Sequence, residues 1–412
     1  MIAGQVDRPL RFLHDSFSDK SSFFKEMGSD AANLHQLPLV MGGAGFSYQL
    51  HPAPESLPIQ QILLRAFELG LRTIDTSPYY EPSEQLIGKA LSDPEVASSY
   101  PREGIIIMTK VGRIKENQFD YSPAWIRKSV LRSLERFQTT YLDVVFCHDV
   151  EFVSMEDALA AVGVLFDLHR MGTIRKVGIS GYDLDTLAAV ATSVRERYGR
   201  PLDVIQTWAQ LTLQNTQVEK RGLNLFRAAG VNSVFCSSPL AVGLLRNGGI
   251  PAGRTGDWHP APPGLRAAAQ QAALWTEQQG HSMASVALRF AISRARRNCS
   301  PGFAISTITG ISTLSDLEQN VATAKQILEN DPEAPKSTSL RDFTELDDTT
   351  IARDETLYNQ IRAILGEWVD YNFAREVPKE ETVRNHTPLQ VDTKEVKVVT
   401  KEFAPSAIVA SV

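Results

Sequence analysis

Short apolar runs alternate with amphipathic stretches between residues 37 and 330 of this chain. The apolar runs are rich in Val, Ile and Leu and end in polar residues, which is typical of parallel strands buried on both faces. In the intervening stretches apolar residues recur every three or four positions, which indicates helices. The predicted strands lie at residues 37–46, 71–74, 105–108, 142–147, 174–179, 202–205, 231–236 and 304–308.

Helices are predicted at residues 58–69, 83–91, 122–137, 155–171, 183–197, 219–229, 263–279, 282–294 and 314–328. This alternation predicts an α/β fold, and it fits a (β/α)8 TIM barrel spanning residues 37–330. A doubly wound parallel sheet has the same periodicity and stays open as an alternative. The segment contains no linker, which favours one closed barrel.

Both ends of the chain differ from this segment. Residues 1–36 have mixed charge and little periodicity, so we expect a loosely attached N-terminal arm. Residues 331–412 form the predicted C-terminal extension, which opens with a polar, proline-containing stretch. Apolar periodicity predicts a helix over residues 349–367, and the Lys-, Glu- and Thr-rich composition after residue 377 predicts a mobile tail.

Composition narrows the class of protein. The 412 residues carry a formal net charge of -6, and 43% of them are apolar, as in a globular protein with a sizeable core. Mild acidity disfavours general nucleic-acid or membrane binding, and the sequence predicts no secretory signal or membrane span. Three widely spaced cysteines predict reduced thiols in a cytoplasmic protein. We therefore expect a small-molecule partner, and no oligomeric state is favoured.

Polar residues stand at or just beyond the strand ends, and the carboxyl ends of barrel strands converge on one face. Singly, each has an ordinary structural explanation: Asp75 can cap a turn on which Tyr80 packs, and His148 can be a core histidine. A single histidine without a second ligand at metal spacing predicts no metal site. The set comprises Asp75, Tyr80, Lys110, His148, Ser180, Gln206, Ser237 and Thr309.

Four of these residues together form an acid/base set. A tyrosine has an ordinary pKa of about 10, which is too high for efficient proton transfer at neutral pH. We expect the Lys110 cation to lower the pKa of the Tyr80 phenol, and Asp75 to keep that lysine charged and oriented. His148 can orient a substrate oxygen. The set therefore suits interconversion of a carbonyl and an alcohol.

In order and spacing, the four residues resemble the catalytic tetrad of the aldo-keto reductases. Residues 178–182 resemble the family's nicotinamide segment, residues 237–245 its pyrophosphate loop and residues 309–320 its adenosine segment. The chain departs from the family at Gly181, where Asn is common, and at Ser237, where an aromatic residue often stacks on the nicotinamide. The resemblance implies binding of NAD, with NADP possible, through Gly43, Ser180, Gly181, Gln206, Ser237, Pro239, Leu240, Gly243, Gly310, Ser312, Asp316, Gln319 and Asn320.

The Gly42–Gly45 stretch raises a second possibility, a dinucleotide-binding loop, but it lacks the third glycine at the required spacing.

Residues 258–261 and 238–240 resemble the branch of the family that dehydrogenates D-arabinose or L-galactose. This resemblance implies NAD-dependent oxidation of an aldose at C1 to the lactone, with Tyr80 as acid/base and with Trp258 and His259 at the substrate. Asp316 stands where NADP-dependent relatives often carry an arginine, and its charge would repel a 2′-phosphate. Two alternatives stay open: an NADP-dependent aldehyde or ketone reductase, and a non-enzymatic, nucleotide-binding regulatory subunit on the same scaffold.

Overall fold

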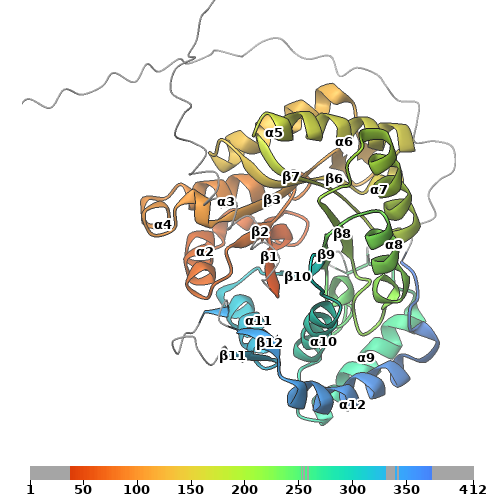
Figure 1. Ribbon diagram of the computed structural model, residues 1–412. Coiled ribbons are helices and arrows are strands. Elements are labelled where there is room, and N and C mark those ends of the chain that lie inside the picture. The colour runs from red at the N-terminus through yellow and green to blue at the C-terminus, as the bar shows by residue number, and fades with distance from the viewer. Residues whose placement is uncertain are drawn as a thin grey trace, which may run out of the picture. The chain divides into compact units, whose positions relative to one another are not determined.

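The computed structural model describes residues 38–251, 253, 256–257, 259–330, 339–340 and 343–373. Its parallel strands close into a barrel that is surrounded by helices (Figure 1). Leu39 of the first strand pairs with Thr307 of the last, and this closure excludes the doubly wound alternative. Around the barrel the strands are β1 (Leu39–Gly42), β10 (Ala304–Gly310), β9 (Ser233–Ser237), β8 (Val204–Trp208), β7 (Ile174–Gly181), β6 (Leu142–His148), β3 (Ile106–Val111) and β2 (Thr73–Asp75).

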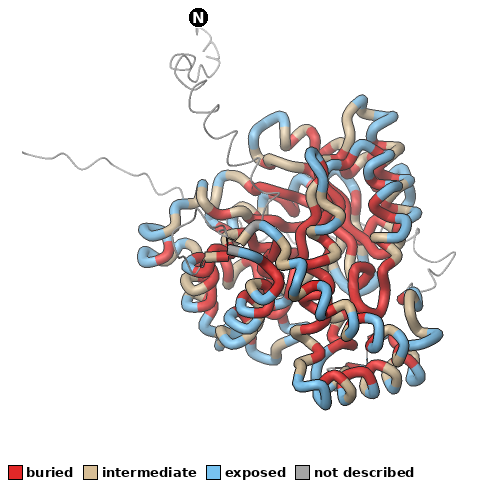
Figure 2. The backbone as a smooth tube through the Cα atoms, turned by 60° about the horizontal axis from the view of Figure 1, so that its bottom comes forward, coloured by how far each residue is buried: buried red, intermediate tan, exposed pale blue. Residues whose placement is uncertain are grey.

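The helices bury their apolar faces toward the barrel and expose their polar faces (Figure 2). Ser122, Asp183 and Ser282 cap α5, α7 and α10, because each side chain accepts a hydrogen bond from a backbone N–H of the first turn. These caps confirm the predicted helix starts. The helices are α2 (Ile59–Glu68), α3 (Ser83–Leu91), α4 (Pro94–Ser99), α5 (Pro123–Phe137), α6 (Met155–Arg170), α7 (Leu184–Tyr198), α8 (Leu223–Ala228), α9 (Pro263–Gln278), α10 (Met283–Arg297), α11 (Leu314–Lys325) and α12 (Asp348–Leu365).

Side chains along the strands alternate between the barrel interior and the surrounding helices. An apolar layer fills the interior and consists of Val40, Met108, Val144, Phe146, Val204, Phe235 and Ile308. Because the side-chain period is two, the second residue beyond this layer also points inward, and there the strands reach their carboxyl ends. Lys110, His148, Gln206 and Ser237 occupy such positions, and Ser180 pairs with His148 across β6 and β7. The apolar layer therefore forms the floor of a polar mouth.

Several connecting elements differ from the sequence prediction. The predicted helix at 219–229 begins as a π-helical turn, Val218–Gly222, and α8 covers only its second half. Gly222 in its middle weakens a regular α-helix. Two strand pairs were too short for a periodic signal, namely β4 (Arg113–Lys115) with β5 (Gln118–Phe119), and β11 (Leu328–Asn330) with β12 (Phe343–Leu346). The predicted N-terminal arm and mobile tail lie outside the described residues.

The C-terminal helix α12 confirms the predicted helical extension and packs on α9 and α10. Arg289 of α10 donates to Asp354 of α12 at 2.5 Å and 3.3 Å, and both side chains are buried. The Tyr358 hydroxyl donates to the same carboxylate at 3.3 Å. A buried ion pair therefore joins the extension to the barrel. No helix within the described ranges is long and apolar enough to cross a membrane.

Candidate active site

An ion pair between Asp75 at the end of β2 and Lys110 on β3 lies in the barrel mouth. The Lys110 Nζ donates to both Asp75 carboxylate oxygens and to the Thr76 carbonyl, each at 2.9 Å. The Gln206 Nε2 also donates to Asp75, at 3.2 Å. Burial raises the pKa of Asp75, and the Lys110 ammonium opposes that effect. All three ammonium protons are thus directed at fixed acceptors.

Tyr80, on the loop after β2, lies beside this pair, with the Lys110 nitrogen 5.3 Å from the centroid of its ring. Burial raises the pKa of the Tyr80 hydroxyl, and the carboxylates of Asp75 and Asp149 raise it further. Burial outweighs the surrounding charges, so the net direction is upward, and the lowering of this pKa by Lys110 stays a prediction. Asp75 and Thr76 accept the hydrogen bonds of the ammonium, and the Asp75 charge opposes its field.

His148, at the end of β6, completes the predicted set. Its ring lies 6.0 Å from the Tyr80 ring and nearly perpendicular to it. The His148 Nδ1 lies 3.2 Å from the hydroxyl of Ser77, and the Tyr121 hydroxyl donates to the His148 carbonyl at 2.6 Å. Burial, followed by the cations of Lys110 and Arg113, holds the pKa of His148 well below its ordinary value. The imidazole is therefore neutral at pH 7 and has one donor and one acceptor nitrogen.

A second charged group beside the tetrad was missed by the sequence analysis. Arg113 forms an ion pair with Asp149, which directly follows His148. Its guanidinium lies 4.2 Å from the centroid of the Tyr79 ring. The available signal was weak: Arg113 is only three residues beyond Lys110, but it belongs to a short hairpin without periodicity.

The Glu151 carboxyl group lies where a side chain at position 181 would stand, and this position is a glycine in the present chain. One of its oxygens accepts from the backbone N–H of Tyr182 at 2.6 Å, and the other is buried without a hydrogen-bond partner. Burial, together with the nearby Asp149 carboxylate, raises the pKa of Glu151 to about 8. A Cβ on residue 181 would lie 2.1 Å from the Glu151 Oε2. The family's asparagine therefore does not fit here unless Glu151 moves.

Replacing Gly181 by alanine is accordingly expected to displace the Glu151 carboxyl group and to destabilise the fold by about 1 kcal/mol, the low end for overpacking, because a side-chain end can move more easily than backbone. Urea unfolding measures the loss. Gly310→Ala is the matched control, since its added methyl group meets nothing within 4 Å. Equal stability of the two variants would contradict the proposed overlap.

Two features of the mouth fit a nicotinamide dinucleotide. The Gln206 side-chain oxygen is buried and has no hydrogen-bond partner, so it is available to an amide donor. In the loop after β9, Ser238, Ala241, Val242 and Gly243 all have positive φ. Non-glycine residues in this region are strained and recur at ligand sites, and successive backbone N–H groups of this kind can bind anions.

Asp316 has a structural role as well as its predicted role at the ribose. At the start of α11 its backbone N–H donates to the Thr313 hydroxyl at 3.0 Å. Its Oδ2 accepts from the backbone N–H groups of Ser312 and Thr313, each at 3.0 Å. This reciprocal cap fixes the position of the carboxylate at the end of β10.

The remaining cofactor candidates lie around the same rim. Asn320 donates to the Gly310 carbonyl at 3.3 Å, and Gln319 lies one residue before it on α11. Ser180 donates to the carbonyl of Cys147 at 3.4 Å. The Gly43 carbonyl accepts from the Ser83 hydroxyl at 3.0 Å, in the turn after β1. Ser237, Pro239 and Leu240 lie at the end of β9 and in the loop that follows.

Of the two predicted substrate residues, Trp258 lies outside the described residues. His259 is buried, and its Nδ1 accepts from the Ala261 N–H at 3.0 Å while its Nε2 lies 3.0 Å from the Ala241 carbonyl. Its ring packs edge-on against Phe373 at 5.4 Å. These contacts indicate that His259 shapes the loop, and its contact with substrate stays a prediction.

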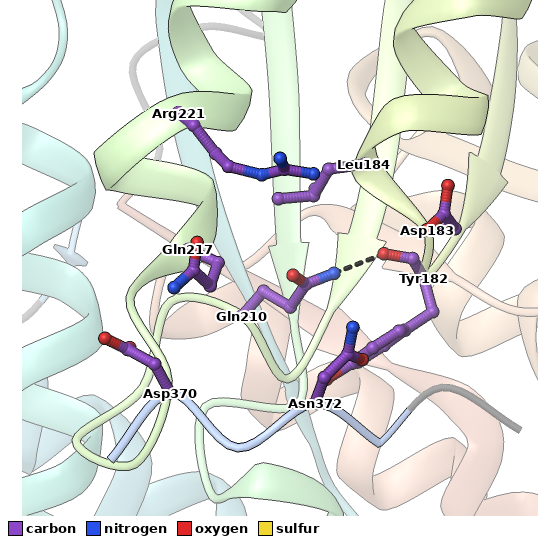
Figure 3. Close-up of a pocket in the computed structure, with 8 residues that line it drawn as sticks. All are labelled: Tyr182, Asp183, Leu184, Gln210, Gln217, Arg221, Asp370 and Asn372. Carbon is purple, nitrogen blue, oxygen red and sulfur yellow. Dashed lines mark hydrogen bonds between the residues drawn. The ribbon is translucent and has the colours of Figure 1, made fainter.

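A polar hollow of ≈ 290 Å³ lies beside the loops after β7 and β8 (Figure 3). No tetrad residue lines it, and Gln210 on its wall donates to the Tyr182 carbonyl. Among the described residues, no group of three or more His, Cys, Asp and Glu side chains could hold a metal ion.

Comparisons with known proteins agree with this geometry. The model of the Aldo/keto reductase family matches residues 38–333. D-arabinose 1-dehydrogenase from Saccharomyces cerevisiae is 42% identical over 258 residues, which cover 62% of this chain and 75% of the relative. L-galactose dehydrogenase from Arabidopsis thaliana is 35% identical over 265 residues, covering 64% and 76%.

The fold also resembles the holo form of aldo-keto reductase AKR11C1 from Bacillus halodurans, with a TM-score of 0.51, 21% identity and coverage of 78% of this chain and 91% of that one. The closed barrel and the family match, which extends over most of the chain, lead to the same conclusion: this protein belongs to the aldo/keto reductase family.

Proposed function

We propose that this enzyme oxidises an aldose at C1 to the corresponding lactone and uses NAD as the oxidant. The main support for this proposal is the buried Asp75–Lys110 ion pair, which lies beside Tyr80 and His148 in the barrel mouth. The 42% identity to a protein named D-arabinose 1-dehydrogenase supports an aldose as the substrate. A neutral His148 is suited to a hydroxyl-bearing substrate, because it can donate one hydrogen bond without adding a further cation beside Lys110 and Arg113.

In this proposal the deprotonated Tyr80 hydroxyl accepts the proton of the C1 hydroxyl, and His148 donates a hydrogen bond to the same oxygen. Lys110 cannot approach the phenol freely, because Asp75 and Thr76 hold it, so its role is to fix the local field. NAD, when bound, supplies the hydride acceptor. Gln206 and Ser180 would hold its amide, the loop after β9 its pyrophosphate, and Asp316, Gln319 and Asn320 its adenosine.

The test is the initial rate with D-arabinose, L-galactose and L-fucose, each with NAD⁺ and with NADP⁺, followed by absorbance of the reduced cofactor. Turnover with NAD⁺ and one of these sugars supports the proposal, and their ranking identifies the preferred aldose. Oxidation of NADPH by a simple aldehyde, with no turnover of any sugar, would instead establish the reductase alternative.

The cofactor preference is expected to depend on the charge of Asp316. Asp316→Asn keeps an oxygen that can accept the cap hydrogen bonds. It removes the negative charge that would repel a 2′-phosphate of a bound cofactor. Its kcat/KM with NADP⁺ should rise about tenfold relative to that with NAD⁺, as about 1.4 kcal/mol of repulsion is lost. An unchanged ratio of the two values would show that Asp316 does not select the cofactor.

A further inference from the structure

Arg113 is a largely buried cation that lies close to the proposed acid/base residues. It lies on β4, two residues after Val111 at the end of β3, and its side chain is 16% exposed. The guanidinium stacks on the Tyr79 ring at 4.2 Å and donates to the Glu116 carbonyl at 2.9 Å. The Tyr79 and Tyr80 rings are 5.8 Å apart. Arg113 therefore places its charge one aromatic ring away from Tyr80.

The hairpin that carries Arg113 is fastened to the end of β6. Gly112 has a φ of 98°, and a Cβ there would lie 2.2 Å from the Tyr121 ring, so this close approach requires glycine. The Tyr121 hydroxyl in turn donates to the carbonyl of His148. Arg113 and His148 are therefore held by one rigid connection.

Asp149 links the two groups. Its φ of 60° turns the chain sharply after β6, and its carboxylate pairs with Arg113. The same carboxylate oxygen lies 3.6 Å from the His148 Nε2. The pair contributes one positive and one negative charge, both largely removed from water, next to two proton-handling side chains.

We infer that Arg113 and Asp149 form a positioning pair, whose balanced charges set the protonation of His148 and Tyr80. This inference rests on the proposed function for its catalytic meaning, but the charge balance itself does not. Burial has the largest effect on both groups, since it raises the pKa of Tyr80 and lowers that of His148. On top of it the Arg113 cation lowers both pKa values, whereas Asp149 raises that of Tyr80. The titratable and charged groups around them are Asp75, Tyr79, Lys110, Tyr121 and Glu151.

The first test needs neither substrate nor cofactor. The His148 imidazole is followed by carbon-13 NMR from about pH 8 to about pH 5, on either side of the ordinary histidine pKa, and assigned with His148→Gln. Wild-type His148 should stay neutral. Arg113→Met should bring its protonation into this range, because a repelling cation is lost and Asp149 is left unpaired. Arg113→Lys, which keeps the charge, should behave like the wild type.

The second test uses the pH dependence of kcat/KM for sugar oxidation. Arg113→Met should move the limb assigned to Tyr80 upward and Asp149→Asn should move it downward, each by about one pH unit, a tenfold change in rate at fixed pH. In the double variant this limb should occur at nearly the same pH as in the wild type, because both charges have been removed. Arg127→Met, which breaks the exposed pair with Asp167, is the control.

The inference is overturned if His148 titrates in Arg113→Lys as it does in Arg113→Met. It is also overturned if Arg113→Met and Asp149→Asn move the Tyr80 limb of the pH profile in the same direction. Should Arg113→Met fail to fold, Asp149→Asn decides alone, and an unchanged limb counts against the pair. If no sugar is oxidised while the NMR result holds, the proposed function fails and the charge balance stands.

Discussion

Tyr80→Phe should lower kcat for aldose oxidation by about 10²–10⁴-fold, because the variant has no hydroxyl to accept the proton of the C1 alcohol. The phenyl ring keeps the edge-on packing against His148 and the approach to Lys110, so the barrel should fold normally. The measurement is the single-turnover rate with NAD⁺ and the best sugar, together with a thermal unfolding curve for each protein.

Tyr79→Phe is the matched control for this experiment, since Tyr79 is the neighbouring phenol and packs on the same histidine at 5.9 Å. Its loss of rate should be much smaller than that of Tyr80→Phe. Near-wild-type turnover in Tyr80→Phe would remove this residue from the acid/base role, whatever the behaviour of Tyr79→Phe.

The largest expected effect on stability is at the buried pair that holds α12. Asp354→Ala leaves the Arg289 guanidinium buried without its carboxylate and removes the acceptor of the Tyr358 hydroxyl. Breaking one side of a buried ion pair destabilises a protein by about 3–5 kcal/mol. Guanidinium unfolding, followed by tryptophan fluorescence and circular dichroism, should show this loss.

Glu68→Ala is the control, because the Arg65–Glu68 pair is similar in chemistry but exposed. Exposed ion pairs contribute about 0–1 kcal/mol to the free energy of unfolding, so the stability of this variant should remain close to that of the wild type. The double variant Arg289→Met with Asp354→Leu removes both buried charges and should recover much of the lost stability. Similar unfolding of Asp354→Ala and Glu68→Ala would mean that the buried pair does not fasten α12.

The barrel could be predicted from sequence because each strand and helix has its own local signal. Valine- and isoleucine-rich runs, caps such as Ser122 and Asp183, and terminal glycines repeat around the whole fold. The proposed tetrad could be identified because barrel strands deliver their last residues to one face, so Asp75, Lys110 and His148 meet despite their separation in sequence.

The electrostatics of the mouth could not be predicted, because they depend on contacts without a sequence period. The hydrogen bond from Lys110 to Thr76 depends on a backbone carbonyl as its acceptor. The pairing of Arg113 with Asp149 depends on a short hairpin and on a single left-handed residue. Glu151 reaches Gly181 from another loop, and only its position after folding reveals the overlap.

The register of each strand matters as much as its composition, because it decides which side chains point into the barrel. Both faces of β3 and β6 are apolar for most of their length, so inserting one residue would hardly change their hydrophobicity. Yet it would turn Lys110 and His148 toward the helices and bring Thr109 and Cys147 to the mouth. A single-residue insertion within one of these strands would therefore remove the chemistry of the mouth without a visible change in the apolar pattern of the strand.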